Sequence, residues 1–234
     1  MIFLRSLLFF LMQCLFAVLV GVSALLTFWL PPLLRYRLVS CWALSMMWFM
    51  RVLCGIRLEV RGAENIPAEP CIILCKHQST WETIALQKVF PPQVWVLKRE
   101  LLWIPFFGWG LALTSPIAID RSNGKEAMRQ LLAEGKDRLA KGFCVVIFPE
   151  GTRVPYGQRV QYKVGGALLG AHCGVPVVPV AHNAGKFWAR HSFLKHPGTI
   201  TMSIGAAISP EGLKASEINQ RVENWIEAEV ERIG

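Results

Sequence analysis

Residues 71–82 read Cys-Ile-Ile-Leu-Cys-Lys-His-Gln-Ser-Thr-Trp-Glu, an apolar run that ends in a histidine, followed five positions later by a carboxylate. The run predicts a buried strand with His77 at its tip. Two side chains five residues apart on one α-helix point about 140° away from each other. His77 and Glu82 therefore meet only where the strand ends at His77 and a helix begins near Ser79. We expect a strand, a tight turn and a helix.

Two interpretations of Glu82 are open at this point. In the first, Ser79 caps the helix and Glu82, three residues later, is its reciprocal partner in a capping box, without any chemistry. In the second, Glu82 fixes the tautomer of His77 while the other ring nitrogen takes a proton from a substrate hydroxyl. The pair has no nucleophile at a recognisable turn, so this second interpretation favours direct attack over a covalent intermediate.

The N-terminal segment is apolar enough to anchor the chain in a membrane. Residues 6–30 contain 25 uncharged residues, which as a helix measure about 38 Å, against roughly 30 Å for the hydrocarbon core of a bilayer. Residues 27–30 offer no small-residue cleavage site of the kind that ends a signal peptide. A second apolar run over residues 38–50 has 13 residues. We expect it to be too short to span and either to lie in the membrane interface or to re-enter the same leaflet.

Positive charge lies mainly after this anchor. One charged side chain, Arg5, precedes residue 35, whereas five arginines follow closely: Arg35, Arg37, Arg51, Arg57 and Arg61. By the positive-inside rule we expect the rest of the chain on the cytoplasmic side of the inner membrane. The formal net charge of +9 fits an anionic membrane surface and a phosphate-bearing substrate. Without a recognisable nucleic-acid module, no nucleic-acid partner is expected.

Cysteine usage indicates a reducing compartment. The chain has seven cysteines, an odd number, without a Cys-x-x-Cys pair, and five of them lie in apolar runs. This pattern is typical of buried free thiols. We predict neither a disulfide framework nor a metal site, and the sequence indicates no cofactor.

From residue 56 onward, short β-rich runs alternate with helical patterns, which predicts an α/β fold with a central, mostly parallel or mixed sheet flanked by helices. We expect strands at residues 56–60, 71–75, 94–97, 116–119, 143–148, 175–181 and 199–204. We expect helices at residues 81–88, after Asn123, at 163–173 and from Ser216. Residues 101–111, aromatic but interrupted by proline and glycine, fit either core packing or the lining of an apolar groove at the membrane face.

Polar clusters follow three of the predicted strands. They are His77 with Glu82, Asp120 with Arg121, and the run Glu-Gly-Thr-Arg at 150–153. In α/β sheets, ligands bind just beyond the carboxyl ends of the strands, so we expect the three clusters to converge on one site. In the last cluster the glycine lets the backbone approach a ligand, and the arginine offers a bidentate fork for phosphate.

As a set, these clusters resemble the lysophospholipid acyltransferase superfamily, most closely the bacterial 1-acyl-sn-glycerol-3-phosphate acyltransferases. The family's first motif, a histidine and an acid five positions on, is matched at residues 77–82. Its second is similar to Ile-Asp-Arg at 119–121, its third to Phe-Pro-Glu-Gly-Thr-Arg at 148–153, and its fourth to Val-Pro-Val-Val-Pro-Val at 175–180. The order and spacing agree over residues 56–205. One departure is Glu82, where the family's usual acid is aspartate.

The resemblance implies transfer of an acyl group from a thioester, acyl-CoA or acyl carrier protein, to the sn-2 hydroxyl of lysophosphatidic acid, giving phosphatidic acid at a phospholipid membrane. It implies that His77 is the general base and Glu82 its orienter. It implies that Arg153, together with Arg121 and Lys98, binds the phosphate of the acceptor. It also implies that Glu150, Gly151 and Thr152 shape the acceptor site. Membrane-anchoring helices are expected over residues 1–54 and an acyltransferase domain over 55–234.

Three other functions are open. In the first alternative, the chain is an acyltransferase whose acceptor is a different lyso-lipid, such as a lyso-ornithine lipid. In the second, the chain is a non-catalytic membrane protein that binds lipid or acts as a scaffold. In the third, it is a cysteine hydrolase that uses His172 and Cys173, although both residues lie in an apolar helical pattern that is typical of packing.

Overall fold

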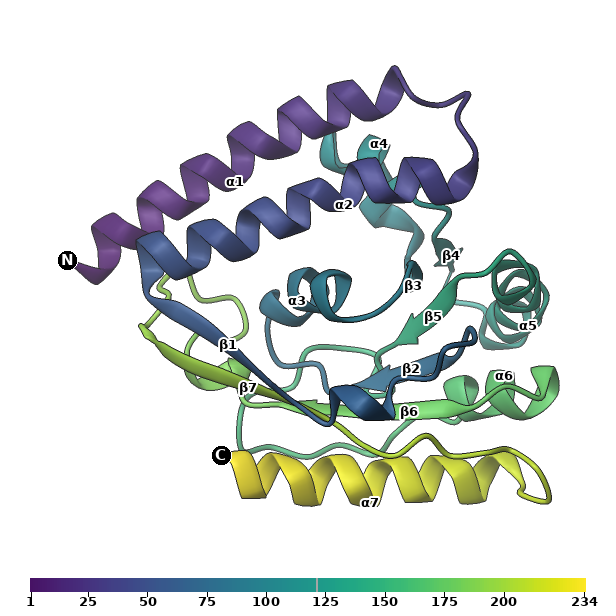
Figure 1. The fold of residues 1–234 in the computed structure, drawn as a ribbon. Helices are drawn as coiled ribbons and strands as arrows, with labels where there is room; N and C mark the ends of the chain where they lie inside the picture. Colours follow the sequence, from purple (N-terminus) through teal and green to yellow (C-terminus); the bar gives the residue numbers. More distant parts are fainter. Residues whose placement is uncertain (121) are drawn as a thin grey trace.

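A mixed sheet of seven strands runs through the part of the chain that the computed structural model describes, residues 1–120 and 122–234 (Figure 1). The strand order is β1-β7-β6-β2-β5-β3-β4. The strands are β1 (Ile56–Arg61), β2 (Ile72–Cys75), β3 (Gln93–Lys98), β4 (Ile117–Ile119), β5 (Cys144–Ile147), β6 (Val177–His182) and β7 (Gly198–Ile204). Neighbours are parallel except β6 and β7, which are antiparallel. The predicted fold class is confirmed.

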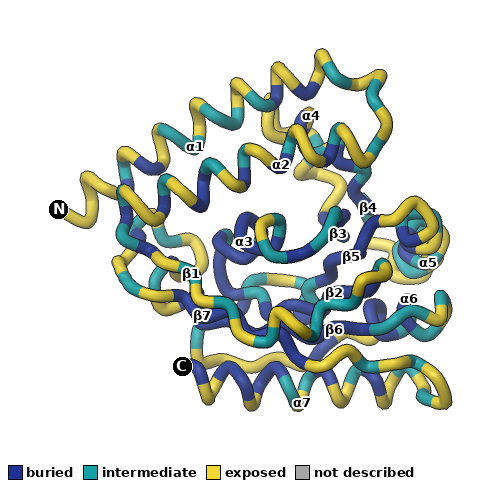
Figure 2. Tube along the Cα trace, in the orientation of Figure 1, coloured by how far each residue is buried: buried dark blue, intermediate teal, exposed yellow. Residues whose placement is uncertain are grey.

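The central strands β2 and β5 are buried along their whole length because helices cover both faces of the sheet (Figure 2). Successive side chains of a strand point to opposite faces. Ile73 accordingly belongs to a buried cluster with residues of the N-terminal helices, whereas Ile72 and Leu74 belong to a second cluster on the other face. Continuous apolar runs are typical of parallel strands enclosed in this way.

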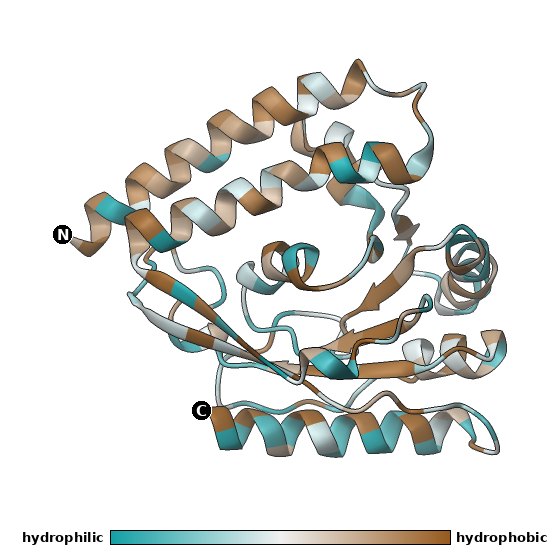
Figure 3. Cartoon of the chain, viewed as in Figure 1, coloured by the Kyte–Doolittle hydropathy of each residue, from teal (hydrophilic) through white to brown (hydrophobic). Residues whose placement is uncertain are grey.

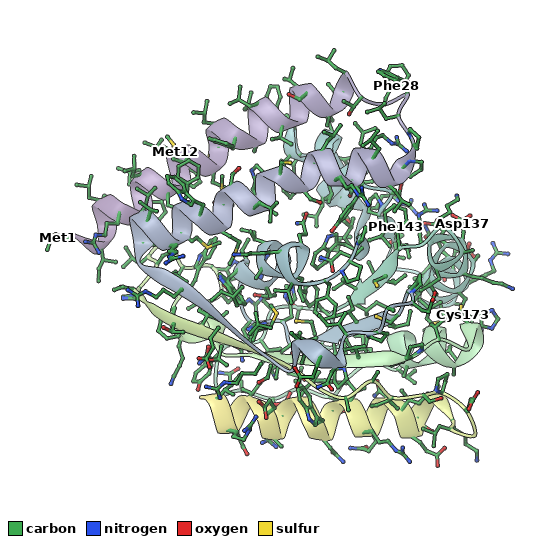
Figure 4. All side chains as sticks on the ribbon, in the orientation of Figure 1. Met1, Met12, Phe28, Asp137, Phe143 and Cys173 are labelled. Atoms are coloured by element: carbon green, nitrogen blue, oxygen red, sulfur yellow. The ribbon has the colours of Figure 1, made fainter. Side chains whose placement is uncertain are left out.

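Within the described residues, five α-helices follow the first strand: α3 (Trp81–Val89), α4 (Phe107–Ala112), α5 (Gly124–Ala140), α6 (Gly165–Cys173) and α7 (Ala215–Ile233). α3 lies on the same face of the sheet as the N-terminal helices, and α5, α6 and α7 cover the opposite face (Figure 1). The helix α7 presents Ile218, Val222 and Ile226 to the sheet. Side chains fill both layers (Figure 4). The predicted helices are confirmed; α4 was not predicted as a helix.

Two long apolar helices, α1 (Ile2–Leu25) and α2 (Pro32–Phe49), precede the sheet, and α2 continues through a π-helical turn over Met50–Cys54. The expectation that the second apolar run is too short to span is therefore wrong as to length, and its position in the interface stays a prediction. It is part of one helix over Pro32–Cys54, because the arginines that limited the run lie within the helix and Pro32 occupies its first turn, where proline is tolerated. α1 and the helix over Pro32–Cys54 are each long and apolar enough to cross a bilayer, which suggests membrane association.

The outward face of α1 is both apolar and exposed (Figures 2 and 3). Exposed side chains on this face include Leu8, Leu11, Leu15 and Leu19. The inward face of α1 packs on the rest of the protein. Phe9 of α1 belongs to one buried cluster with Met46 of α2 and Ile73 of the sheet. The predicted boundary between residues 54 and 55 falls at the left-handed Gly55, which ends the second helix, and the division into two domains stays a prediction.

Candidate active site

The carboxyl ends of the parallel strands β6, β2, β5 and β3 meet at one edge of the sheet, in that order. His77 follows β2, residues 148–153 follow β5, and Lys98 ends β3. A cavity of about 760 Å³ opens at this edge, and His77, Lys98, Gly151, Thr152 and Arg153 line it. The structure thus brings these predicted site residues together.

The cavity is bounded by the N-terminal helices and by residues 101–111. Phe10 and Val20 of α1 and Trp42 of α2 contribute to one wall. The aromatic stretch contributes Leu101, Ile104, Phe106, Phe107, Gly110 and Leu111. Of the two interpretations of that stretch, the lining of an apolar groove therefore describes its place in the structure. The apolar side chains of the helices and of residues 101–111 therefore line the same cavity as His77.

His77 is fixed on two sides. Its Nδ1 lies 2.7 Å from Oε1 of Glu82, and its ring stacks on Phe148 with centroids 3.8 Å apart and planes inclined by 11°. A carboxylate at Nδ1 favours a proton on that nitrogen. In the neutral ring with this tautomer, Nε2 carries no proton and can accept one, which the predicted role of His77 as a base requires.

The same oxygen of Glu82 also accepts hydrogen bonds from the backbone. The amide of Gln78 donates to it at 3.1 Å and that of Ser79 at 3.0 Å. The capping box is only half formed, since the Ser79 hydroxyl accepts from the Trp81 amide and Thr80 is the N-cap residue. Glu82 therefore contacts both His77 and the amides of the turn. The contacts of both interpretations are present, and a catalytic role for Glu82 stays a prediction.

Glu82 is fully buried, and its charge depends on its neighbours. Burial raises the pKa of Glu82, but the nearby His182 imidazole and the hydrogen bonds from His77 and Ser79 outweigh it, so the pKa lies below its usual value. Glu82 is thus ionised at neutral pH. Its second oxygen, Oε2, has no hydrogen-bond partner among the described residues.

His182 is a residue of this site that the sequence interpretation missed. Its Nδ1 accepts a hydrogen bond from the Ala184 amide, and its Nε2 lies 2.8 Å from the carbonyl of Lys76 and 3.8 Å from Oε2 of Glu82. This pattern places the proton on Nε2. Burial lowers the pKa of His182, although the Glu82 carboxylate opposes this shift. A histidine at the end of a strand parallel to β2 was the available signal.

A buried cluster of Lys76, Glu150, Tyr162 and Glu227 lies next to the backbone of His77. Lys76 Nζ is 2.5 Å from Glu227 Oε1 on α7 and 3.5 Å from Glu150 Oε1, and the Tyr162 hydroxyl donates to Glu227 at 2.7 Å. Glu150 also accepts from the His77 amide at 3.2 Å. Burial raises the pKa of Glu150 to about 7, despite the opposing attraction of Lys76. Glu150 therefore supports the backbone of His77 from below.

The remaining predicted residues occupy different positions. Arg153 donates from Nε to the carbonyl of Ser79 at 2.8 Å, which ties the loop after β5 to the turn after β2. Lys98 is exposed at the tip of β3. Asp120 is exposed and accepts from the amide and hydroxyl of Ser122. Arg121 lies outside the described residues. Within residues 1–120 and 122–234, no cluster of histidine, cysteine, aspartate or glutamate suits a metal ion.

The geometry argues against the hydrolase. His172 and Cys173 end α6, which leads through Gly174 into the amino end of β6 (Figure 4 labels Cys173). Because β6 is parallel to β2, this is the edge of the sheet opposite to His77.

A histidine held by a carboxylate at a strand tip thus lies beside an apolar cavity, and the family of proteins to which this site belongs follows from sequence similarity. The model of the acyltransferase family matches residues 57–183. The chain belongs to the acyltransferase family.

Named relatives support this membership. The chain is 52% identical to 1-acyl-sn-glycerol-3-phosphate acyltransferase of Pseudomonas aeruginosa over 86% of this chain and 81% of that protein. It is 32% identical to the human beta enzyme of the same name, over 73% of this chain and 64% of that protein. The crystal structure of the 1-acyl-sn-glycerophosphate acyltransferase PlsC from Thermotoga maritima has the same fold, with a TM-score of 0.83 at 22% identity over 98% of this chain and 95% of that one.

Proposed function

We propose that this protein transfers a fatty acyl group from a thioester donor, acyl-CoA or acyl carrier protein, to the sn-2 hydroxyl of 1-acyl-glycerol 3-phosphate, making phosphatidic acid for phospholipid biosynthesis. The names of the relatives support the reaction. The observation that carries it is the contact of 2.7 Å between His77 Nδ1 and Glu82 Oε1 at the edge of an apolar cavity. This pair is a base without a protein nucleophile, as direct transfer to a hydroxyl requires.

The chemical step follows from this pair. With Nδ1 protonated and directed at Glu82, Nε2 of His77 takes the proton from the sn-2 hydroxyl as its oxygen attacks the thioester carbonyl. The new C–O bond forms, the C–S bond of the tetrahedral intermediate breaks, and the departing thiolate takes the proton from Nε2. Glu82 stabilises the imidazolium that exists between the two proton transfers. His182 and Glu150 hold Glu82 and the His77 backbone in place.

The acceptor phosphate is bound on the β5 side of His77. The Nε of Arg153 is engaged by Ser79, so the two terminal nitrogens of its guanidinium remain to form the bidentate fork that phosphate prefers. Lys98 completes the clamp, while Gly151 and Thr152 shape the backbone around it. Arg121, which the family resemblance also assigns to the clamp, lies outside the described residues. The acyl chains occupy the groove lined by residues 101–111 and by the helices α1 and α2.

Catalysis takes place at the cytoplasmic face of the inner membrane. The exposed apolar side chains of α1 provide a surface for the hydrocarbon region of the bilayer. The arginines at positions 35, 37 and 51 fit the anionic headgroups of the cytoplasmic leaflet. A membrane-embedded lyso-lipid reaches the cavity from the side that α1 and α2 line.

The experiment that tests the proposal compares acceptors. The purified protein is given labelled acyl-CoA, or acyl carrier protein charged with the same acyl group, together with lysophosphatidate, a lyso-ornithine lipid or a lyso-lipid without the phosphomonoester. Transfer to lysophosphatidate is expected to have the highest kcat/KM. Transfer to none of them would leave a non-catalytic scaffold, and a preference for lyso-ornithine lipid would replace the acceptor.

Arg153 variants test the phosphate clamp in the same assay. Arg153→Lys keeps the charge but loses the fork, and Arg153→Ala loses both. Each charge-assisted hydrogen bond is worth about 1.5–3 kcal/mol, so each bond lost should lower kcat/KM for lysophosphatidate roughly 10- to 150-fold. The acceptor without the phosphomonoester is the control and should change little. Equal losses for both acceptors would show that Arg153 supports the loop instead of reading the phosphate.

A further inference from the structure

A second group of polar and charged side chains lines the same cavity and comes from the loop after β6. Arg190 and His191 line the same cavity as His77 and Arg153. They lie in the loop after β6, and β6 and β5 pair with opposite edges of β2. Since neighbouring strands are about 4.8 Å apart, the loops that follow β6 and β5 leave the sheet roughly 10 Å from each other. The two loops therefore leave the sheet on either side of β2, the strand that leads to His77, and both contribute basic residues to the cavity.

The loop that carries Arg190 and His191 has a defined conformation. The His196 amide donates to the Phe187 carbonyl at 2.8 Å and closes the loop. Within it, the Ser192 amide donates to the Ala189 carbonyl at 3.0 Å, so that Arg190 and His191 are the two central residues of a tight turn. His191 has φ = 58°, a left-handed conformation that few residues other than glycine adopt. Such a conformation persists only where the surroundings hold it.

The turn is held from behind by Lys195. This lysine is buried, and its ammonium lies 4.5 Å from the ring centroid of Trp188 and 5.3 Å from that of Phe9. Its backbone amide donates to the Ser6 hydroxyl of α1 at 3.0 Å. The loop is thus fastened to the first helix, whereas Arg190 and His191 at its tip are exposed.

One phosphate does not account for cations on both sides of the base. Lysophosphatidate has a single phosphate, and Arg153 and Lys98 already lie on the β5 and β3 side. The two substrates meet at His77, and both donors attach the acyl group through 4′-phosphopantetheine, which has its own phosphate. Because two phosphates repel each other, each is best bound by separate cations at a distance from the other.

We infer that Arg190 and His191 bind the phosphate of the donor's 4′-phosphopantetheine arm, on the side of His77 opposite to the acceptor phosphate. This assignment rests on the proposed function. It makes the loop after β6 the donor side of the site and the loop after β5 the acceptor side. The group recognised is common to acyl-CoA and acyl carrier protein, so both donors use the same turn.

The test is a donor series that isolates this phosphate. The wild-type protein, Arg190→Ala and Arg190→Gln are assayed with the acyl thioesters of pantetheine and of 4′-phosphopantetheine, and then with acyl-CoA and acyl carrier protein. Wild type should have a KM for the phosphopantetheine thioester at least about tenfold below that for the pantetheine thioester, as expected for a charge-assisted bond. Either variant should reduce this ratio to within about threefold, and KM for lysophosphatidate should change less than about twofold.

Two further variants complete the design. His191→Asn keeps a residue that tolerates the left-handed conformation and should weaken the phosphate preference in part. Arg221→Ala removes the same charge from an exposed position on α7, on the opposite face of the sheet, and should leave the preference unchanged.

Three outcomes would overturn the inference. They are a wild type that does not distinguish the two pantetheine thioesters, variants that keep the full ratio, and variants that raise KM for lysophosphatidate instead. If acyl-CoA alone loses affinity in the variants while the phosphopantetheine thioester does not, the turn binds the nucleotide part of CoA and the inference is also wrong. Absence of any transfer by wild type would instead reject the proposed function, so the two failures are distinguishable.

Discussion

Replacing Glu82 by glutamine removes one charge from a fully buried position without changing the size of the side chain. The amide oxygen can still accept from His77 Nδ1 and from the Gln78 and Ser79 amides, so the turn should remain folded. What is lost is the attraction between the carboxylate and the imidazolium that forms during turnover. At an effective dielectric constant of about 20, charges about 4 Å apart attract by about 4 kcal/mol. We expect kcat to fall about a thousandfold.

Glu82→Asp separates charge from distance. Removing one methylene draws the carboxylate back by about 1.5 Å, which lengthens the contact with His77 from 2.7 Å to about 4 Å and breaks the hydrogen bond. The variant keeps a negative charge near His77 and loses mainly one hydrogen bond, so kcat should fall about 10- to 150-fold. The expected order of kcat is therefore Glu, then Asp, then Gln.

The assay is single-turnover acyl transfer to lysophosphatidate under saturating donor, with thermal unfolding of each variant measured in the same detergent. A cap without a catalytic role predicts another result, because glutamine is a good partner in a capping box. Glu82→Gln with a kcat within about threefold of wild type would refute the orienting role. So would a loss of kcat that is matched by a loss of folded protein.

Two other predictions use the same preparations. His77→Ala should lower kcat by roughly 10²–10⁴-fold with little change in unfolding temperature, and more than a tenth of wild-type kcat would exclude His77 as the base. The pKa of Glu150 is raised from 4.5 to about 7, so its contribution to stability is fully present below about pH 4.5 and is lost as pH rises to 7. Urea unfolding should show Glu150→Gln gaining up to about 3 kcal/mol relative to wild type between these pH values; a constant difference would contradict the assignment.

Local patterns were sufficient for most of the secondary structure and for the core of the site. The apolar run of residues 71–75 has to be buried, and a helix that starts directly after it allows His77 and Glu82 to meet. Both facts depend on residues within five positions of each other. The same reasoning located the loop of residues 148–153 at a strand end, because β5 is as uniformly apolar as β2.

Counting apolar residues was less successful for the second N-terminal helix. Charged residues end an apolar run in a count, but arginines near a helix terminus do not end the helix itself. Their long side chains reach polar surroundings while the backbone continues, as at Arg35. The helix over Pro32–Cys54 is consequently longer than the run that predicted it.

The sequence by itself determined the strands, the turn at His77 and the set of motifs, because each depends on neighbours along the chain. Tertiary structure alone decided what surrounds them. Lys76 meets Glu227 across 151 positions, and His182 approaches Glu82 across 100. Arg190 reaches the cavity because β6 happens to lie beside β2. Such pairs depend on the order of the strands in the sheet. That order is set by the burial of apolar surface over the whole chain, so no local sequence pattern near either residue predicts the contact.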